Sequence, residues 1–269
     1  MTTPMNSPPL SIQLTLPERF RENHGFLDTL STLGELGFHG VELNIADPLA
    51  ADFADISHLL GSYGLALTAF ASGLSARERG LSLSHYDSAV RERTIDWCVD
   101  VFDRLPGDGI GFIAGYIKGA PAADPGRAIN DFSGSLVRLA SAADRRGVHL
   151  LIEATNRYES SVANSLDDAA ALISGYDSAA VSILPDTFHM NIEETDMNSA
   201  LAEHAGRYRS LHLSDNNRRF PGFGSIDFGR VFDTLGRTAY TGGIVIEGNA
   251  GKDLSADVKF SAAYLRSVR

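Results

Sequence analysis

Four apolar runs in the second half of the chain end in, or carry, an ionisable side chain. LLIE ends at Glu153, VSIL is followed by a proline and Asp186, SLHL contains His212, and GIVIE ends at Glu247. Three carboxylates placed close together would repel one another and hold protons at neutral pH unless a cation offset their charge. The four side chains offer three hard oxygens and one imidazole, a set that suits manganese, cobalt or magnesium. We therefore expect a site for one divalent metal ion.

Further polar residues follow the same runs. Glu159 follows in EATNRYE, His189 in DTFHMNIEE, and Arg218 in HLSDNNRRFPGFG. An arginine presents a planar fork of donors to a substrate oxygen, and the Pro-Gly pair of PGFG indicates a tight turn that would hold its loop in place. Arg219 could act in the same way. Taken alone, Glu159 could equally form a surface ion pair with Arg157 or Arg218.

An alternation of apolar runs and amphipathic segments must position these residues. Helices are predicted over 26–38, 89–105 and 136–146, and a capping box at Ser165 predicts another through residue 173. Buried parallel strands need crossover helices, so eight such units in 269 residues favour a closed (β/α)8 barrel, a single domain over 1–269, rather than an open sheet. The predicted strands are 10–14, 40–43, 66–71, 110–114, 149–153, 181–184, 210–213 and 244–247.

In such a barrel the carboxyl ends of all strands meet at one mouth, so the chemical residues of the late strands become neighbours. The polar, Gly/Ser-rich segment 73–86 is interpreted as the loop after the third strand. The fourth strand, in LPGDGIGFIAG, is unusually rich in glycine.

Composition excludes several classes of partner. The net charge of -11 and pI near 5.1 argue against nucleic acid, because such binding depends on neutralising phosphates. No Gly-rich nucleotide motif opens a helix, so no nucleotide cofactor is expected. The single cysteine, Cys98, fits a helical core position. Without a signal-like start or a stretch of roughly 18 apolar residues, we expect a cytoplasmic protein that does not enter a membrane.

LIEATNRYE, LPDTFHMNIEE, HLSDNNRRFPGFGSIDF and GGIVIEG resemble the xylose-isomerase-like TIM barrels grouped as sugar (phosphate) isomerases/epimerases, closest to the D-tagatose and D-psicose (allulose) 3-epimerase branch. The resemblance is specific over 149–248 and, through GFHGVELN, extends in outline over nearly the whole chain. It implies one Mn2+ or Co2+ ion and association as a homodimer or homotetramer. The implied metal ligands are Glu153, Asp186, His212 and Glu247.

The resemblance also implies roles for individual residues. Glu153 and Glu247 would act as the acid/base pair, and Glu159, His189 and Arg218 would hold the carbonyl end of the sugar. One glutamate would remove a proton from the carbon next to the carbonyl and the other would return it from the opposite face, through a metal-stabilised enediolate. The expected function is therefore that of a ketose 3-epimerase. Return to the neighbouring carbon would instead give aldose–ketose isomerisation.

Three other functions remain open from the residues. The same metal site could serve an isomerase or lyase acting on hydroxypyruvate, an inosose or a keto-sugar derivative. An endonuclease IV-like nuclease would need more histidines on the third and fourth strands than AFASG and GFIAGYIKG provide. A non-catalytic sugar-binding module would not need all of these residues intact. The first and third strands, IQLTLPERF and LTAFASG, depart from the epimerase branch, and His24 and His85 could reach the mouth only from loops.

Overall fold

Every predicted apolar run forms a strand in the computed structural model, which describes residues 8–107, 109–176 and 180–269. All pairings between the named strands are parallel. The strands are β1 (Leu10–Thr15), β2 (Gly40–Asn44), β3 (Ala66–Ala71), β4 (Gly111–Ala114), β5 (His149–Glu153), β6 (Val181–Leu184), β7 (Ser210–Leu213) and β8 (Gly243–Ile246).

The sheet closes on itself between its two outer strands. Its order is β6, β5, β4, β3, β2, β1, β8, β7. Parallel bridges between Ile183 and Tyr208 and between Asp186 and His212 join β6 to β7. The predicted (β/α)8 barrel is confirmed, and the second bridge already places two of the predicted metal ligands side by side.

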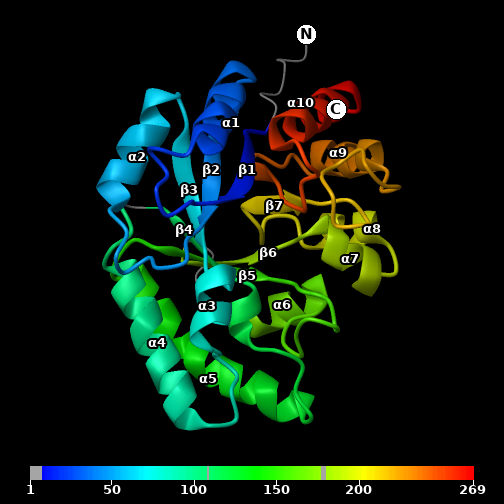
Figure 1. Ribbon diagram of the computed structural model, residues 1–269. Helices are drawn as coiled ribbons and strands as arrows, with labels where there is room; N and C mark the ends of the chain where they lie inside the picture. Colours follow the sequence, from blue (N-terminus) through cyan, green and yellow to red (C-terminus); the bar gives the residue numbers. More distant parts are fainter. Residues whose placement is uncertain (1–7, 108, 177–179) are drawn as a thin grey trace.

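Helices surround the strands (Figure 1). The long helix α5 starts at Pro125 rather than at 136 as predicted, because Asp124 caps it and proline suits the first helical position. The helices are α1 (His24–Glu35), α2 (Phe53–Ser62), α3 (Gly73–Arg79), α4 (Ser88–Phe102), the 3-10 turn η1 (Tyr116–Lys118), α5 (Pro125–Asp144), α6 (Leu166–Ile173), α7 (Thr187–Glu193), α8 (Met197–Glu203), α9 (Phe228–Arg237) and α10 (Leu254–Ser267).

The interpretation of 73–86 as a loop was wrong over its first half, where α3 forms and ends at Gly80 in the left-handed region. Two serines at the start of α3 are tertiary anchors. The Ser72 hydroxyl donates to the carbonyl oxygen of Ile113 at 2.6 Å, and the Ser75 hydroxyl donates to that of Ile45. These bonds fasten α3 across the strand ends at the mouth of the barrel.

The glycine-rich fourth strand has a packing reason. A Cβ atom added at Gly111 would lie 2.9 Å from both Ala69 Cβ and Leu151 Cδ1, closer than real Cβ contacts allow. Glycine therefore lets β4 fit between β3 and β5. The barrel interior is filled there by a small buried cluster of Ala69, Ala71, Ile113, Leu151 and Leu184.

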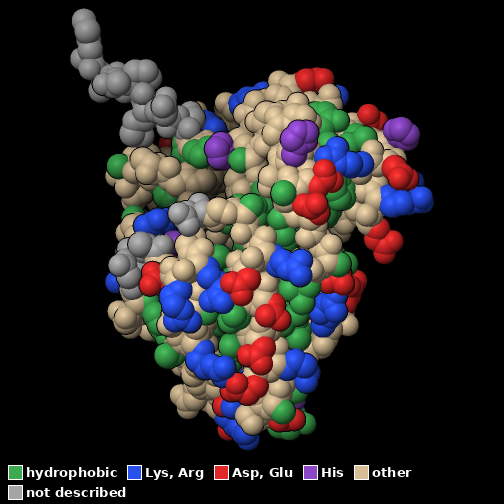
Figure 2. All heavy atoms as spheres, turned by 90° about the vertical axis from the view of Figure 1, so that its left-hand side faces the viewer, with side chains coloured by type: hydrophobic (Ala, Val, Ile, Leu, Met, Phe, Trp, Pro, Cys, Tyr) green, Lys and Arg blue, Asp and Glu red, His purple; other side chains and the backbone are tan. Residues whose placement is uncertain are grey.

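A larger core lies between the strands and the surrounding helices. Cys98 is fully buried in it, and burial raises the pKa of its thiol, as expected for a core residue without catalytic use. On the outer face, acidic and basic side chains are interspersed over α4 and α5 (Figure 2), where Arg91 lies 3.3 Å from Asp131. Among the described residues, no helix is long and apolar enough to cross a membrane.

The capping box of α6 gives a test of local stability. The Ser165 hydroxyl accepts from the Asp168 N–H at 3.1 Å, and the Asp168 carboxylate accepts from the Ser165 N–H at 3.0 Å. Replacing Ser165 with Ala should lower the free energy of unfolding by about 1 kcal/mol, measured by urea denaturation. The control is Ser133→Ala, since the Ser133 hydroxyl bonds only a carbonyl of its own helix. Equal effects of the two substitutions would contradict the capping role.

Candidate metal centre

The barrel brings the four predicted metal ligands to one point. Glu153 ends β5, Asp186 follows β6, His212 lies in β7, and Glu247 follows β8. One ligand atom from each side chain lies within 4.8 Å of the others. Three carboxylate oxygens and one imidazole nitrogen at this spacing fit a divalent cation that prefers oxygen donors.

The pKa values of the carboxylates also indicate that this site needs a positive charge. Burial, and next the charge of Glu247, raise the pKa of Glu153 to about 7 and that of Asp186 well above its usual value. Burial acts the same way on Glu247, but the charge and hydrogen bond of His212 outweigh it and bring the pKa down to about 2. The carboxylates therefore cannot all ionise together at neutral pH unless a cation joins them.

His189 lies against this cluster with one nitrogen occupied. Its Nδ1 atom accepts from the Asn156 side-chain amide at 2.7 Å and from the Asn156 backbone N–H at 3.2 Å. Its Nε2 atom lies 3.7 Å from Asp186 Oδ2 and is buried without a hydrogen-bond partner among the described residues. Burial, followed by the charge of Arg218, lowers the pKa of His189 to about 3. The ring is thus neutral and has an N–H free to donate to a ligand.

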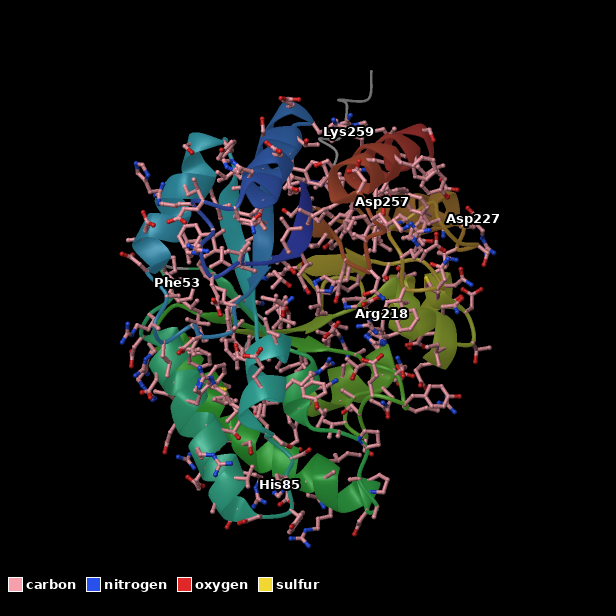
Figure 3. All side chains as sticks on the ribbon, in the orientation of Figure 1. Phe53, His85, Arg218, Asp227, Asp257 and Lys259 are labelled. Carbon is pink, nitrogen blue, oxygen red and sulfur yellow. The ribbon has the colours of Figure 1, made fainter. Side chains whose placement is uncertain are left out.

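Arg218 is the arginine that reaches the site. Its guanidinium lies 2.8 Å from Glu159 Oε1 and stacks over the ring of Phe188 at 4.7 Å (Figure 3). Arg219 instead faces Asp257 at 3.4 Å. The structure therefore resolves the choice between the two arginines. His85 lies far from Arg218 in the same view, near the bottom of the molecule.

A buried carboxylate that the sequence analysis did not identify shapes the loop of Arg218. Asp215 accepts the backbone N–H groups of Asn216, Gly222, Gly224 and Ile226 at 2.8–3.0 Å. This network ties the PGFG turn to the start of the loop that carries the arginine. Arg218 itself has a φ of 58°, a left-handed conformation that a non-glycine residue adopts only where its surroundings hold it.

Glu42 is the second functional candidate that was missed. It lies in β2, is 2 % exposed, and its Oε2 atom accepts from His212 Nε2 at 2.9 Å. The other ring nitrogen, Nδ1, faces Glu247 and lies 3.8 Å from Glu153 Oε1. Desolvation lowers the pKa of His212, but Glu42 and Glu247 together raise it well above its ordinary value. A carboxylate behind a histidine ligand fixes the ring and its tautomer.

Gly115 makes room for the centre. A Cβ atom at this position, just beyond β4, would lie 2.0 Å from Glu153 Oε2. The fully buried Lys118 supports the end of β5 by donating to the carbonyl oxygen of Glu153 and to Thr155 Oγ1. Burial lowers the pKa of Lys118 to about 7, against the charges of nearby carboxylates.

The chain is similar to known proteins over most of its length. Residues 30–268 match the family model described as Xylose isomerase-like TIM barrel. The chain belongs to this family. Within it, the chain is 32% identical over 228 residues to the ketose 3-epimerase of Arthrobacter globiformis, covering 83% of this chain and 78% of the relative.

Two further proteins are similar to this chain over most of their length. The L-ribulose 3-epimerase of Mesorhizobium japonicum is 28% identical over 247 residues, covering 89% of this chain and 81% of that protein. The crystal structure of 3-keto-D-glucoside 4-epimerase from E. coli superposes with a TM-score of 0.79 at 26% identity, covering 97% of this chain and 99% of the other.

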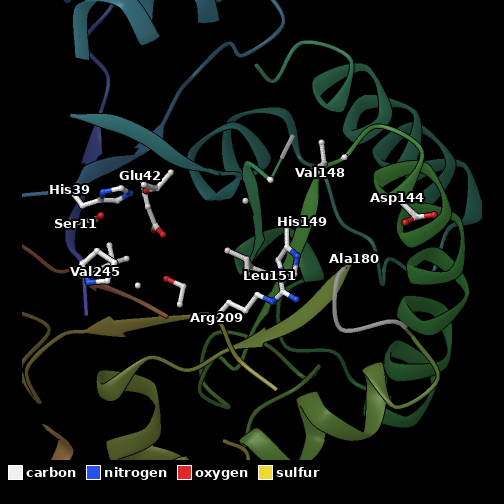
Figure 4. A pocket seen from close by; sticks show the side chains of 17 residues that line it. Ser11, His39, Glu42, Asp144, Val148, His149, Leu151, Ala180, Arg209 and Val245 are labelled. Atoms are coloured by element: carbon white, nitrogen blue, oxygen red, sulfur yellow. The ribbon is translucent and has the colours of Figure 1, made fainter. Parts of the chain in front are cut away.

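This xylose isomerase-like barrel has a cavity at each end. The cavity at the carboxyl ends of the strands has a volume of about 930 Å3 and is lined by Glu153, His189, Arg218 and Glu247. The other, of about 420 Å3, lies among the strand starts, where His39 and Arg209 line it (Figure 4). Active sites of such barrels lie at the carboxyl ends, so the larger cavity is the candidate substrate site.

Metal binding should depend on pH. The protons held by Glu153, whose pKa is raised to about 7, and by Asp186 must leave before these oxygens can bind a cation. The apparent affinity for Mn2+ should therefore rise with pH, by up to about tenfold per pH unit for each proton displaced. Calorimetric titrations in two buffers with different ionisation enthalpies would detect the released protons. An affinity independent of pH, with no proton release, would contradict this.

Glu42 should tune the metal site without touching the metal. Glu42→Gln keeps the shape of the side chain but removes the charge behind His212, so the Mn2+ affinity should fall by about tenfold or more. The matched control is Glu35→Gln, because Glu35 is an exposed residue of α1. If Glu42→Gln binds Mn2+ as tightly as the wild type, in titrations followed by electron paramagnetic resonance, the assigned role is wrong.

Proposed function

We propose that this protein is a divalent-metal-dependent sugar epimerase that inverts the carbon next to a ketone, in the simplest case C3 of a ketose. One observation carries the proposal. Glu153 and Glu247 approach the same point from different strands, with their oxygens within 4.8 Å of each other and of the other two metal-ligand candidates. A carboxylate on each side of one substrate carbon is what removal and return of a proton on opposite faces require.

The metal would be held by Glu153, Asp186, His212 and Glu247, and we propose Mn2+, with Co2+ or Mg2+ as alternatives. When bound, the cation supplies positive charge beside the carbonyl and adjacent hydroxyl oxygens and so lowers the cost of forming the enediolate. The buried oxygen-rich donor set and its raised pKa values support this assignment.

The remaining side chains of the centre would position the sugar. The free Nε2–H of His189 can donate to an oxygen that gains charge, and since the ring is neutral it donates without giving up its proton. Arg218 adds a fixed positive charge, and Glu159 orients that arginine. One glutamate then takes the C3 proton on its carboxylate, and the other delivers a proton to the opposite face. Delivery to the neighbouring carbon would give the isomerase reaction instead.

The activities of the similar proteins support a reaction at the carbon next to a ketone. A ketose 3-epimerase, an L-ribulose 3-epimerase and a 3-keto-D-glucoside 4-epimerase all invert a carbon next to a ketone. The position of the ketone in the sugar differs among them, while the C–H bond broken is of the same kind. The proposal extends this shared chemistry to the present chain.

The setting of the enzyme is also part of the proposal. We infer a cytoplasmic location, which fits a single buried Cys98 that can form no internal disulfide. A homodimer or homotetramer is inferred from the family resemblance alone.

Proton exchange would test the function. The Mn2+-loaded enzyme is incubated in heavy water with fructose, tagatose, psicose or sorbose, and NMR should show deuterium entering C3. Glu247→Gln and Glu153→Gln should slow this exchange by at least about a hundredfold, after correction for bound metal, whereas the surface variant Glu35→Gln should not.

Each other outcome has a clear meaning. Deuterium at C1 would reassign the reaction as aldose–ketose isomerisation. Mn2+ binding with no exchange into any ketose or keto-sugar would refute the epimerase proposal.

A further inference from the structure

The candidate substrate cavity has more room than a single sugar ring needs. Cavities of roughly 300–1,000 Å3 enclose drug-sized ligands, and this one, at about 930 Å3, lies near the top of that range. The metal centre occupies its inner end. At its outer end lies a group that we call the tyrosine rim, formed by Arg77, Tyr116, Pro121 and Tyr158.

The rim exposes aromatic surface to the cavity. Tyr116 is 37% exposed and Tyr158 is 75% exposed, and both line the cavity. Exposed aromatic rings grouped at a pocket mark a place where a ligand packs. An amphipathic tyrosine suits a sugar ring, which offers C–H groups to the aromatic face and hydroxyls to the phenol.

The rim is held in place before any ligand arrives. The guanidinium of Arg77, brought to the mouth by α3, stacks on the Tyr116 ring at 4.9 Å. The backbone N–H of Tyr158 donates to Asn156 Oδ1 at 3.0 Å, and the preceding Arg157 is fixed by a double contact with Glu193. A ligand would therefore meet a Tyr116 ring that is already stacked and a Tyr158 side chain on a hydrogen-bonded backbone, which reduces the entropy lost on binding.

The segments that carry Tyr116 and Tyr158 are joined to each other and form one wall of the cavity. The Ala122 N–H, in the loop after η1, donates to Ser161 Oγ at 2.9 Å, in the loop that carries Tyr158. Asn156 connects this wall to the reacting end of the cavity, because the same side chain donates to His189 Nδ1 and to Glu159 Oε1. The rim and the metal centre are thus parts of one continuous site.

We propose that the tyrosine rim is a subsite for a second sugar ring, so that the preferred substrate is a glycoside whose other ring carries the ketone. This rests on the proposed epimerase function. A glycosidic bond locks the anomeric carbon, so the ketone lies within the ring, as in a 3-keto glycoside, and the inverted carbon is its neighbour. The chemistry is unchanged: one C–H bond is broken and one is formed on the opposite face, with no net oxidation.

The experiment compares three substrates in heavy water: a 3-keto disaccharide, the matching methyl 3-keto glycoside without the second ring, and a free ketose. The wild type should show a kcat/KM for the disaccharide at least about tenfold above that for the methyl glycoside. Tyr158→Ala should lower this value by about tenfold for the disaccharide alone, and Tyr158→Phe, which keeps the ring, should preserve it.

Tyr86→Ala is the matched control. Tyr86 is 70% exposed like Tyr158, but it lies beside His85 and does not line the cavity. This variant should leave all three substrates unaffected. A wild type that gains nothing from the second ring, or a Tyr158→Ala variant that slows all three substrates equally, would overturn the subsite.

A binding measurement separates this proposal from the epimerase function. Saturation-transfer NMR with the unoxidised parent disaccharide should show contact of its second ring with the wild type and loss of that contact in Tyr158→Ala. If no substrate exchanges deuterium, the epimerase function fails and this measurement alone decides the subsite. If the free ketose exchanges but the second ring makes no contact, only the subsite fails.

Discussion

The repulsion among three buried carboxylates around one point is the constraint on which the rest of this structure depends. Glu153, Asp186 and Glu247 are brought so close that they cannot all be ionised in the absence of a cation. A protein tolerates such a cluster only when it is compensated, here by His212, by Arg218 and by the cation that the donor set fits. This repulsion would favour binding of a metal ion at the centre, and under the proposed function the charge of that ion would weaken a C–H bond next to a ketone.

The fold meets this constraint with groups that do not themselves react. Glu42 approaches from β2 to fix the far side of the His212 ring, Lys118 holds the end of β5, and Asp215 gathers four backbone N–H groups to shape the Arg218 loop. Asn156 holds both His189 and Glu159. Each is a polar group buried close to the centre, and each has its hydrogen bonds satisfied, so that the ligand and donor geometry is set before substrate binds.

The sequence predicted the strands well, and the four residues it offers as metal ligands do lie together, for one physical reason. Strands buried on both faces read as short apolar runs, and a barrel gathers their ends, so a charged residue after such a run is conspicuous. Helix α3 was missed because the roles of Ser72 and Ser75 depend on carbonyls from other strands. Glu42 was missed because its partner His212 lies 170 residues away. Its position within the apolar run GVELN was the available signal. The place of Tyr158 at the cavity could not be predicted from the sequence, because it depends on which other segments line that cavity.

Gly115 has a consequence for how this protein can change over evolutionary time. Any side chain at that position would occupy the space of the Glu153 carboxylate, with the first added carbon 2.0 Å from its oxygen. Every single substitution of Gly115 would therefore displace the carboxylate. For this reason we expect glycine to be retained at the end of the fourth strand. Tyr116 is the next residue along; it lines the cavity and is partly exposed, so substitutions there meet solvent and ligand rather than the carboxylate cluster. Of these two neighbouring positions, Gly115 must therefore stay glycine if the carboxylate cluster is to persist, whereas Tyr116 can change and alter which substrates fit the cavity.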